Sequence, residues 1–118
     1  MSLLHAESHP DHTVTITVSG AVAYQNPDQI SGAVRAAIVR WAPRLVFLDV
    51  ADVALLEVAT IAALLSSHQA GEWAGIPVRL INVGVLPLSQ LRDQGLVTVL
   101  CPDLLPSETV EPPLIKLP

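Results

Sequence analysis

Three histidines lie close together near the start of the chain, at His5, His9 and His12. Imidazole nitrogens bind zinc and other transition metals, usually together with cysteine or carboxylate ligands. The surrounding segment is polar, contains no cysteine and offers no clear carboxylate geometry. We therefore predict no metal site here and interpret residues 1–11 as a flexible N-terminal segment.

The second group of residues that could perform chemistry consists of three carboxylates, Asp49, Asp52 and Glu57. They follow a predicted buried strand and could converge at one end of a sheet, where paired carboxylates can perform acid–base catalysis. Carboxylates in such loops more commonly cap turns and helices. No Ser-His-Asp set accompanies them, because His68 and its two neighbouring serines point in different directions on a predicted helix. We therefore expect no enzymatic activity.

Cys101 is the single cysteine of the chain, which excludes an internal disulfide. No basic residue lies near it in the sequence to lower the pKa of its thiol, so we expect no reactive thiolate. The six glycines are isolated from one another, and neither common type of phosphate-binding loop is present. The sequence therefore predicts no cofactor.

Composition and charge narrow the class of partner. The formal net charge is −5, and the six Lys and Arg residues are scattered, which argues against nucleic acid as a partner. Hydrophobic residues make up 51% of the chain and charged residues 14%, which is typical of a folded domain. We see no secretory signal and no apolar run long enough to span a membrane, and we expect a cytoplasmic protein.

Hydrophobic periodicity predicts the strands. Residues 13–19 alternate polar and apolar side chains, as a half-buried strand does, and residues 21–25 could add a short second strand or a bulge. Residues 45–50 are nearly all apolar, which indicates a strand covered on both faces. Residues 78–83 read as another buried strand, and residues 97–100 as a last short one.

The predicted helices alternate with these strands. A capping residue, a proline and an acid at positions 26–28 begin the first helix, and Pro43 stops it. Residues 57–70 and 87–93 read as two further helices. Alternation of this kind predicts a single α/β domain with a mixed, mostly parallel sheet of four to five strands and helices packed on it. We place the domain at residues 12–101 and a proline-rich C-terminal tail at residues 102–118.

The segment from Leu45 to Leu65 is the most specific part of the sequence. It resembles the central segment of STAS domains, the family of bacterial anti-sigma factor antagonists, in which a buried strand ends in Asp and Asp-Ser-Ser/Thr-Gly opens an apolar helix. Residues 13–20, 75–83 and 91–100 resemble the family's first strand, later strand and last helix and strand. The resemblance covers roughly residues 12–100 and implies a STAS fold that binds a protein partner.

The chain departs from the family at its regulatory motif. In the family, a partner kinase that is also the anti-sigma factor phosphorylates the first Ser of the motif, and the matching residue here is Val58, which has no hydroxyl. Thr60 replaces the family's glycine and is the remaining candidate hydroxyl, although packing or a local hydrogen bond also explains it. The acidic positions after Gly20 are lost as well. The resemblance thus implies the fold but not the usual phosphorylation switch.

We therefore expect a non-catalytic regulatory module that binds a kinase-type anti-sigma partner. As alternatives, it is an accessory subunit of a transport ATPase complex or a sensor of a small molecule or nucleotide. As a hypothesis, the fixed negative charge of Glu57 at a helix start locks the module in one binding state. The residues expected to contact the partner are Asp52, Ala54, Glu57, Val58, Thr60 and Ile61.

Overall fold

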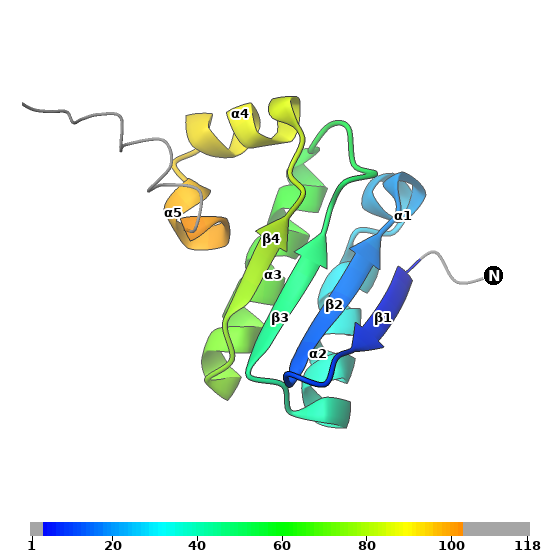
Figure 1. Ribbon diagram of the computed structural model, residues 1–118. Helices are drawn as coiled ribbons and strands as arrows, with labels where there is room; N and C mark the ends of the chain where they lie inside the picture. The colour runs from blue at the N-terminus through cyan, green and yellow to red at the C-terminus, as the bar shows by residue number, and fades with distance from the viewer. Residues whose placement is uncertain (1–3, 103–118) are drawn as a thin grey trace, which may run out of the picture.

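A computed structural model of the chain describes residues 4–102 (Figure 1). In chain order the elements are β1 (Leu4–Ser8), β2 (Thr13–Val18), α1 (Gly20–Gln25), α2 (Asp28–Trp41), β3 (Leu45–Asp49), α3 (Val58–Ala74), β4 (Val78–Ile81), α4 (Val85–Asp93) and α5 (Val97–Leu100). The sheet order is β1-β2-β3-β4, with β1 antiparallel to β2 and the other two pairs parallel. The predicted fold class, an α/β domain with a mixed and mostly parallel sheet, is confirmed.

The helices α2 and α3 cover one face of this sheet (Figure 1). In β3 the side chains alternate: Val46 and Leu48 are fully buried, whereas Leu45 and Phe47 are only half-buried. The prediction that this strand is covered on both faces is therefore wrong. The four-residue apolar run at 45–48 looks the same in either setting, because the side chains on an open face can be apolar too.

The core forms between the covered face of the sheet and the two long helices. Val14, Ile16 and Val18 of β2 are at most 1% exposed, which matches their predicted alternation. They share the buried cluster with Ile30 of α2 and Leu64 of α3. Burial of each such side chain stabilises the fold by about 1.5–3 kcal/mol, so this cluster holds the strand ends in place.

Two segments near β2 differ from expectation. Residues 4–8 form β1 and pair with residues 14–18 of β2, so the flexible segment expected over residues 1–11 is wrong for that part. A polar edge strand is held by backbone hydrogen bonds to its neighbour, so the pattern of its side chains does not predict it. Residues 20–25 form α1 instead of a strand or bulge, because the Ser19 hydroxyl accepts a hydrogen bond from the Val22 N–H at 3.2 Å and caps a helix.

The last predicted strand is also wrong, since residues 97–100 form the single turn α5. Its valines and threonine favour a strand locally, but Val97 and Leu100 are buried against the domain, which decides the conformation. The predicted long helix over residues 57–70 begins at Val58 and continues to Ala74. Gly75, at φ 73°, ends it in the left-handed conformation that favours glycine.

Candidate functional site

The carboxyl ends of β2, β3 and β4 lie at one edge of the sheet, and the connections that leave them gather there (Figure 1). Helix α1 follows β2, an eight-residue loop at 50–57 joins β3 to α3, and α4 follows β4. We call this region the carboxyl-end face. In sheets of parallel strands, binding sites commonly form in this place, because several loops converge there.

One tether ties the β3–α3 loop to α1. The carboxylate of Asp52 accepts a hydrogen bond from the Gly20 N–H at 2.8 Å. A Cβ atom at Gly20 would lie only 2.9 Å from the Asp52 carbonyl oxygen, so the close approach requires glycine. The loop therefore cannot move away from α1 without breaking a charge-assisted hydrogen bond.

Two further tethers hold the same loop and the start of α3. The side-chain amide of Gln90 in α4 accepts from the Leu56 N–H and donates to the Leu56 carbonyl, both at 2.8 Å. The hydroxyl of Thr60 donates to the carbonyl oxygen of Ala23 in α1 at 2.7 Å. The loop is thus fixed between α1 and α4, and the face presents its side chains from a rigid frame.

Apolar side chains are exposed on this face. Seven large hydrophobic side chains are exposed among residues 4–102, and five of them belong to α1, the β3–α3 loop and the first turns of α3 and α4. Val58 and Val85 are 84% and 89% exposed, although each begins a helix of a folded domain. The five residues are Tyr24, Leu55, Val58, Val85 and Leu86. Such concentration of exposed apolar groups marks an interaction surface.

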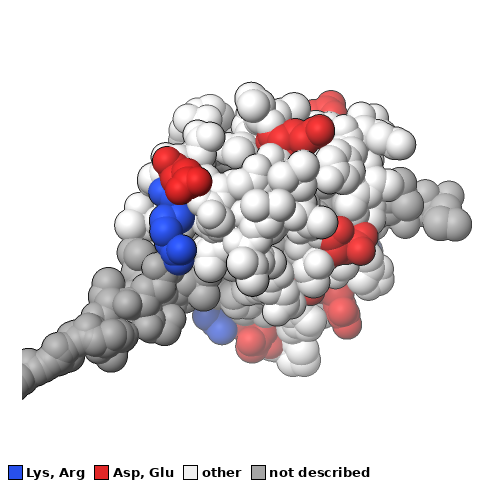
Figure 2. Space-filling view, turned by 90° about the horizontal axis from the view of Figure 1, so that it is seen from above, with Lys and Arg blue, Asp and Glu red and all other residues white. Residues whose placement is uncertain are grey.

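The charge around these apolar groups is mainly negative. Asp49 and Asp52 lie at the end of β3 and just after it, and Glu57 is the N-terminal capping residue of α3, without a side-chain capping hydrogen bond. Figure 2, which views the molecule from above this end, shows acidic patches around a broad uncharged area, with basic side chains toward one side only. The face therefore suits a surface that is apolar in its centre and basic at its rim.

The structure places the predicted contact residues in two groups. Asp52, Ala54, Glu57 and Val58 are exposed on the carboxyl-end face. Thr60 is only 2% exposed and Ile61 9%, because both point into the domain from the first turns of α3. The side chains of these two residues are buried in the structure, and the contact of all six residues with a partner stays a prediction. The Thr60 hydroxyl is enclosed as well and donates its hydrogen bond to the Ala23 carbonyl, in line with the alternative that a hydrogen bond explains this residue.

Sequence reasoning missed several residues of this face. Tyr24 was assigned to a strand or bulge, and Val85 and Leu86 were left outside a helix expected to begin at Pro87. The available signal was their own hydrophobicity in turns beside predicted strand ends. Gln90 gave no signal, since its role depends on a residue 34 positions away in the chain.

The carboxylates act as structural caps. Asp49 accepts a hydrogen bond from the Ala51 N–H at 3.0 Å, as Asp52 does from Gly20. Burial raises the pKa of the Cys101 thiol to about 11, which keeps it protonated at neutral pH. Within the described part of the chain, no three His, Cys, Asp or Glu side chains are grouped as a metal ion would require.

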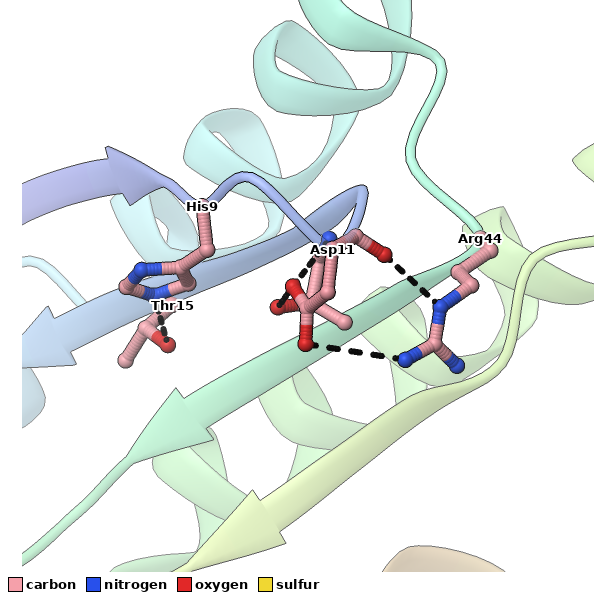
Figure 3. Close-up of polar contacts among 5 residues, drawn as sticks. His9, Asp11, Thr15 and Arg44 are labelled. Atoms are coloured by element: carbon pink, nitrogen blue, oxygen red, sulfur yellow. Dashed lines mark hydrogen bonds and ion pairs between the residues drawn. The ribbon is translucent and has the colours of Figure 1, made fainter.

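At the other end of the sheet, the β1–β2 turn carries a polar network (Figure 3). His9 Nε2 lies 2.9 Å from the Thr15 hydroxyl, and Asp11 accepts hydrogen bonds from the Thr13 hydroxyl and N–H. The hydrogen bond from the Thr13 hydroxyl is the main reason that the pKa of Asp11 is lowered. His9, considered above as a metal ligand, therefore belongs to a turn stabilised by hydrogen bonds within the protein.

Comparison with known proteins gives a family-level match. A family model described as STAS domain matches residues 4–107. No curated protein matches the chain significantly. None of the helices in residues 4–102 is long and apolar enough to cross a membrane.

Three solved structures illustrate the similarity of the fold. The unphosphorylated anti-sigma factor antagonist SpoIIAA is 18% identical, with a TM-score of 0.58 over 77% of this chain and 81% of that one. A sulfate transporter family protein from Wolinella succinogenes is 16% identical, with a TM-score of 0.69 over 82% and 78% of the two chains. A serine-to-glutamate variant of RsbS from Moorella thermoacetica is 15% identical, with a TM-score of 0.67 over 80% and 79%.

Proposed function

The chain belongs to the STAS domain family, and from this premise we propose that it is a non-catalytic regulatory module that binds a protein partner. The observation that carries the proposal is the set of five exposed apolar side chains on the carboxyl-end face. Covering each of them with a partner contributes about 25 cal/mol per Å² of apolar surface removed from water. Because the loops are tethered before binding, little ordering entropy opposes the association.

The proposed partner resembles the kinase-type anti-sigma factors. The similarity of the fold to the anti-sigma factor antagonist SpoIIAA and to RsbS supports this class. The acidic groups around the apolar centre favour a partner with a basic rim. We place this interaction in the bacterial cytoplasm.

The proposed regulation does not use phosphorylation of a serine at the start of α3. Val58 stands at the position that matches the family's phosphorylated serine and has no hydroxyl to accept a phosphate. Thr60, the nearest alternative in the helix, is buried and donates its hydroxyl to Ala23. A kinase would have to unfold the first turn of α3 to reach it. We propose instead that Glu57 supplies a constant negative charge beside the binding surface, favourably placed at a helix N-terminus.

A pull-down from a lysate of the source organism tests the proposal, with the wild-type chain and two variants as parallel baits. Val58→Asp introduces a charge at the centre of the face and is compatible with the first position of α3, where an acid is favourable. Val39→Asp is the matched control, because Val39 is 86% exposed and lies near the C-terminus of α2, outside the carboxyl-end face.

We expect wild type and Val39→Asp to capture the same protein and Val58→Asp to lose it. A kinase-like protein supports the anti-sigma class, whereas an ATPase of a transport complex would identify the accessory-subunit alternative. Equal capture by all three baits would show that the carboxyl-end face is not the binding surface.

A further inference from the structure

One face of the sheet carries no helix. In Figure 1 this face is turned toward the viewer with α2 and α3 behind it, and within residues 4–102 no helix lies in front of the strands. The strands β2, β3 and β4 run parallel, and parallel sheets in folded proteins are mostly covered on both faces. We call this uncovered side of the sheet the open face, and its composition indicates what covers it.

Apolar side chains occupy the middle of the open face. Successive residues of a strand point to opposite faces, so Leu45 and Phe47 of β3 lie on the open face, while their buried neighbours lie against the helices. Ile81 of β4 lies on the open face for the same reason. All three side chains are only half-buried, because neighbouring strands shield them from the sides alone. A second surface laid on the sheet would remove the rest of this apolar area from water.

Opposite charges lie at the two edges of the open face. The strand register aligns four residues in one row across the sheet, in the order Glu7, Thr15, Phe47 and Arg79. Neighbouring strands are about 4.8 Å apart, so about 14 Å of sheet separates the acid on β1 from the base on β4. Each copy of the chain therefore presents a row that is negative at one edge, apolar near the middle and positive at the other edge.

This row is complementary to a second copy of itself. A two-fold axis that runs parallel to the strands, above the open face and between β2 and β3, lays β1 of one copy over β4 of the other. Glu7 of each copy then lies over Arg79 of the other, at the same level along the strands. An axis across the strands would instead bring Glu7 over Glu7 and Arg79 over Arg79, which like-charge repulsion opposes. We propose that two copies of the chain associate through their open faces about the axis parallel to the strands.

The neighbouring row of the open face fits the same arrangement. It contains Thr17 of β2 beside Asp49 of β3. Under the proposed axis, the Thr17 hydroxyl of one copy lies over the Asp49 carboxylate of the other, to which a hydroxyl can donate. A carboxylate accepts several hydrogen bonds, so the bond that Asp49 accepts from the Ala51 N–H does not prevent this contact. A guanidinium has five N–H donors, so pairing with Glu7 of the second copy is compatible with other contacts of Arg79.

The geometry also sets the strength and the orientation of the dimer. The face of a four-stranded sheet is smaller than a standard stable interface, so we expect a dissociation constant in the micromolar range. Because the axis runs along the strands, the carboxyl-end faces of the two copies point in the same direction. The dimer then presents two of the proposed partner-binding faces side by side, and this consequence alone rests on the proposed function.

Sedimentation velocity of the full chain, at concentrations from about 5 to about 500 µM, tests the proposal. The single variants Glu7→Arg and Arg79→Glu each lay like charges over one another in the proposed dimer. The double variant Glu7→Arg/Arg79→Glu restores opposite charges in exchanged positions. The control Arg35→Glu reverses an exposed charge on α2, away from the open face. Thermal unfolding followed by circular dichroism establishes that each variant is folded.

We expect wild type and Arg35→Glu to dimerise with similar dissociation constants. Each single variant raises the dissociation constant at least about tenfold, because the symmetry turns one substitution into two like-charge contacts. The double variant returns to within about threefold of the wild type, as a direct pairing of the two positions requires.

The proposal is overturned if the wild type stays monomeric at the highest concentration, or if the folded single variants dimerise as the wild type does. A folded double variant that does not regain dimerisation overturns the pairing of Glu7 with Arg79 and with it the proposed axis. Glu7 is exposed in the single copy, so Glu7→Arg decides the outcome if Arg79→Glu does not fold. None of these results depends on partner capture at the carboxyl-end face, which Val58→Asp tests separately.

Discussion

The two ends of the sheet use their polar groups in opposite ways. At the amino end, Asp11 accepts hydrogen bonds from Thr13, and its carbonyl accepts one from Arg44 Nε at 2.9 Å, with Arg44 also paired to the Asp11 carboxylate at 3.6 Å (Figure 3). At the carboxyl end, the side chains of Asp52 and Gln90 form hydrogen bonds with backbone groups that hold the loop, and apolar side chains are left facing water.

This difference separates a surface stabilised by its own polar contacts from the surface that we propose for binding. At the amino end, the charged side chains of Asp11 and Arg44 already bond one another and the nearby backbone. The carboxyl end uses its hydrogen bonds to hold the loop and leaves hydrophobic side chains exposed to water. Substitutions at the two ends should therefore affect different properties.

The largest expected effect is on partner binding. Val85→Asp places a charge in the exposed apolar area at the first residue of α4, where an acid is compatible with the helix start. We expect the affinity for the captured partner to fall about 10- to 100-fold, which is the range of a central interface residue. Isothermal titration calorimetry measures it, with Val39→Asp as the control for an exposed valine elsewhere.

If Val85→Asp and Val39→Asp bind alike, α4 does not belong to the binding surface. The face would then be limited to α1, the β3–α3 loop and the start of α3.

A smaller effect is expected on stability when a tether of the carboxyl end is removed. Thr60→Val keeps the shape of the side chain but leaves the buried Ala23 carbonyl without its hydrogen bond. We expect the free energy of unfolding to fall by about 1–3 kcal/mol, the cost of an unsatisfied buried acceptor. Urea denaturation measures the change. Thr98→Val, at an exposed threonine, serves as the control and should change stability little; equal stability of the two variants would contradict the assigned role of Thr60.

The smallest effect is expected at the amino end. Asp11→Asn weakens the exposed network with Thr13 and Arg44, so we expect a slight decrease in Tm at neutral pH and unchanged partner binding. Because the pKa of Asp11 is lowered from 3.8 in the folded protein, its contribution is present above pH 3.8. That contribution disappears as the pH falls through the lowered pKa.

Thermal unfolding of wild type and Asp11→Asn over this pH range checks the sign. Their Tm values should converge in acid, and a difference that grows in acid would refute the assignment.

Segments with their own hydrophobic pattern were predicted well. The alternation in β2 appears in the structure as expected, and the helix predicted to begin at positions 26–28 is α2, whose Ile30 and Val34 are buried. Segments whose conformation depends on distant partners were not. β1 exists through backbone pairing with β2, and α5 is helical although its residues favour strands.

The sequence by itself determined the α/β class, the family resemblance and the absence of a hydroxyl at Val58, because each is written in residue types or short-range periodicity. The tertiary structure alone decided which of the expected contact residues reach the surface. Thr60 and Ile61 turned inward, and Tyr24, Val85 and Leu86 joined the exposed face. The reason is physical: the exposure of a side chain depends on which distant elements pack beside it, and hydrogen bonds such as Gln90 to Leu56 connect residues far apart in the chain.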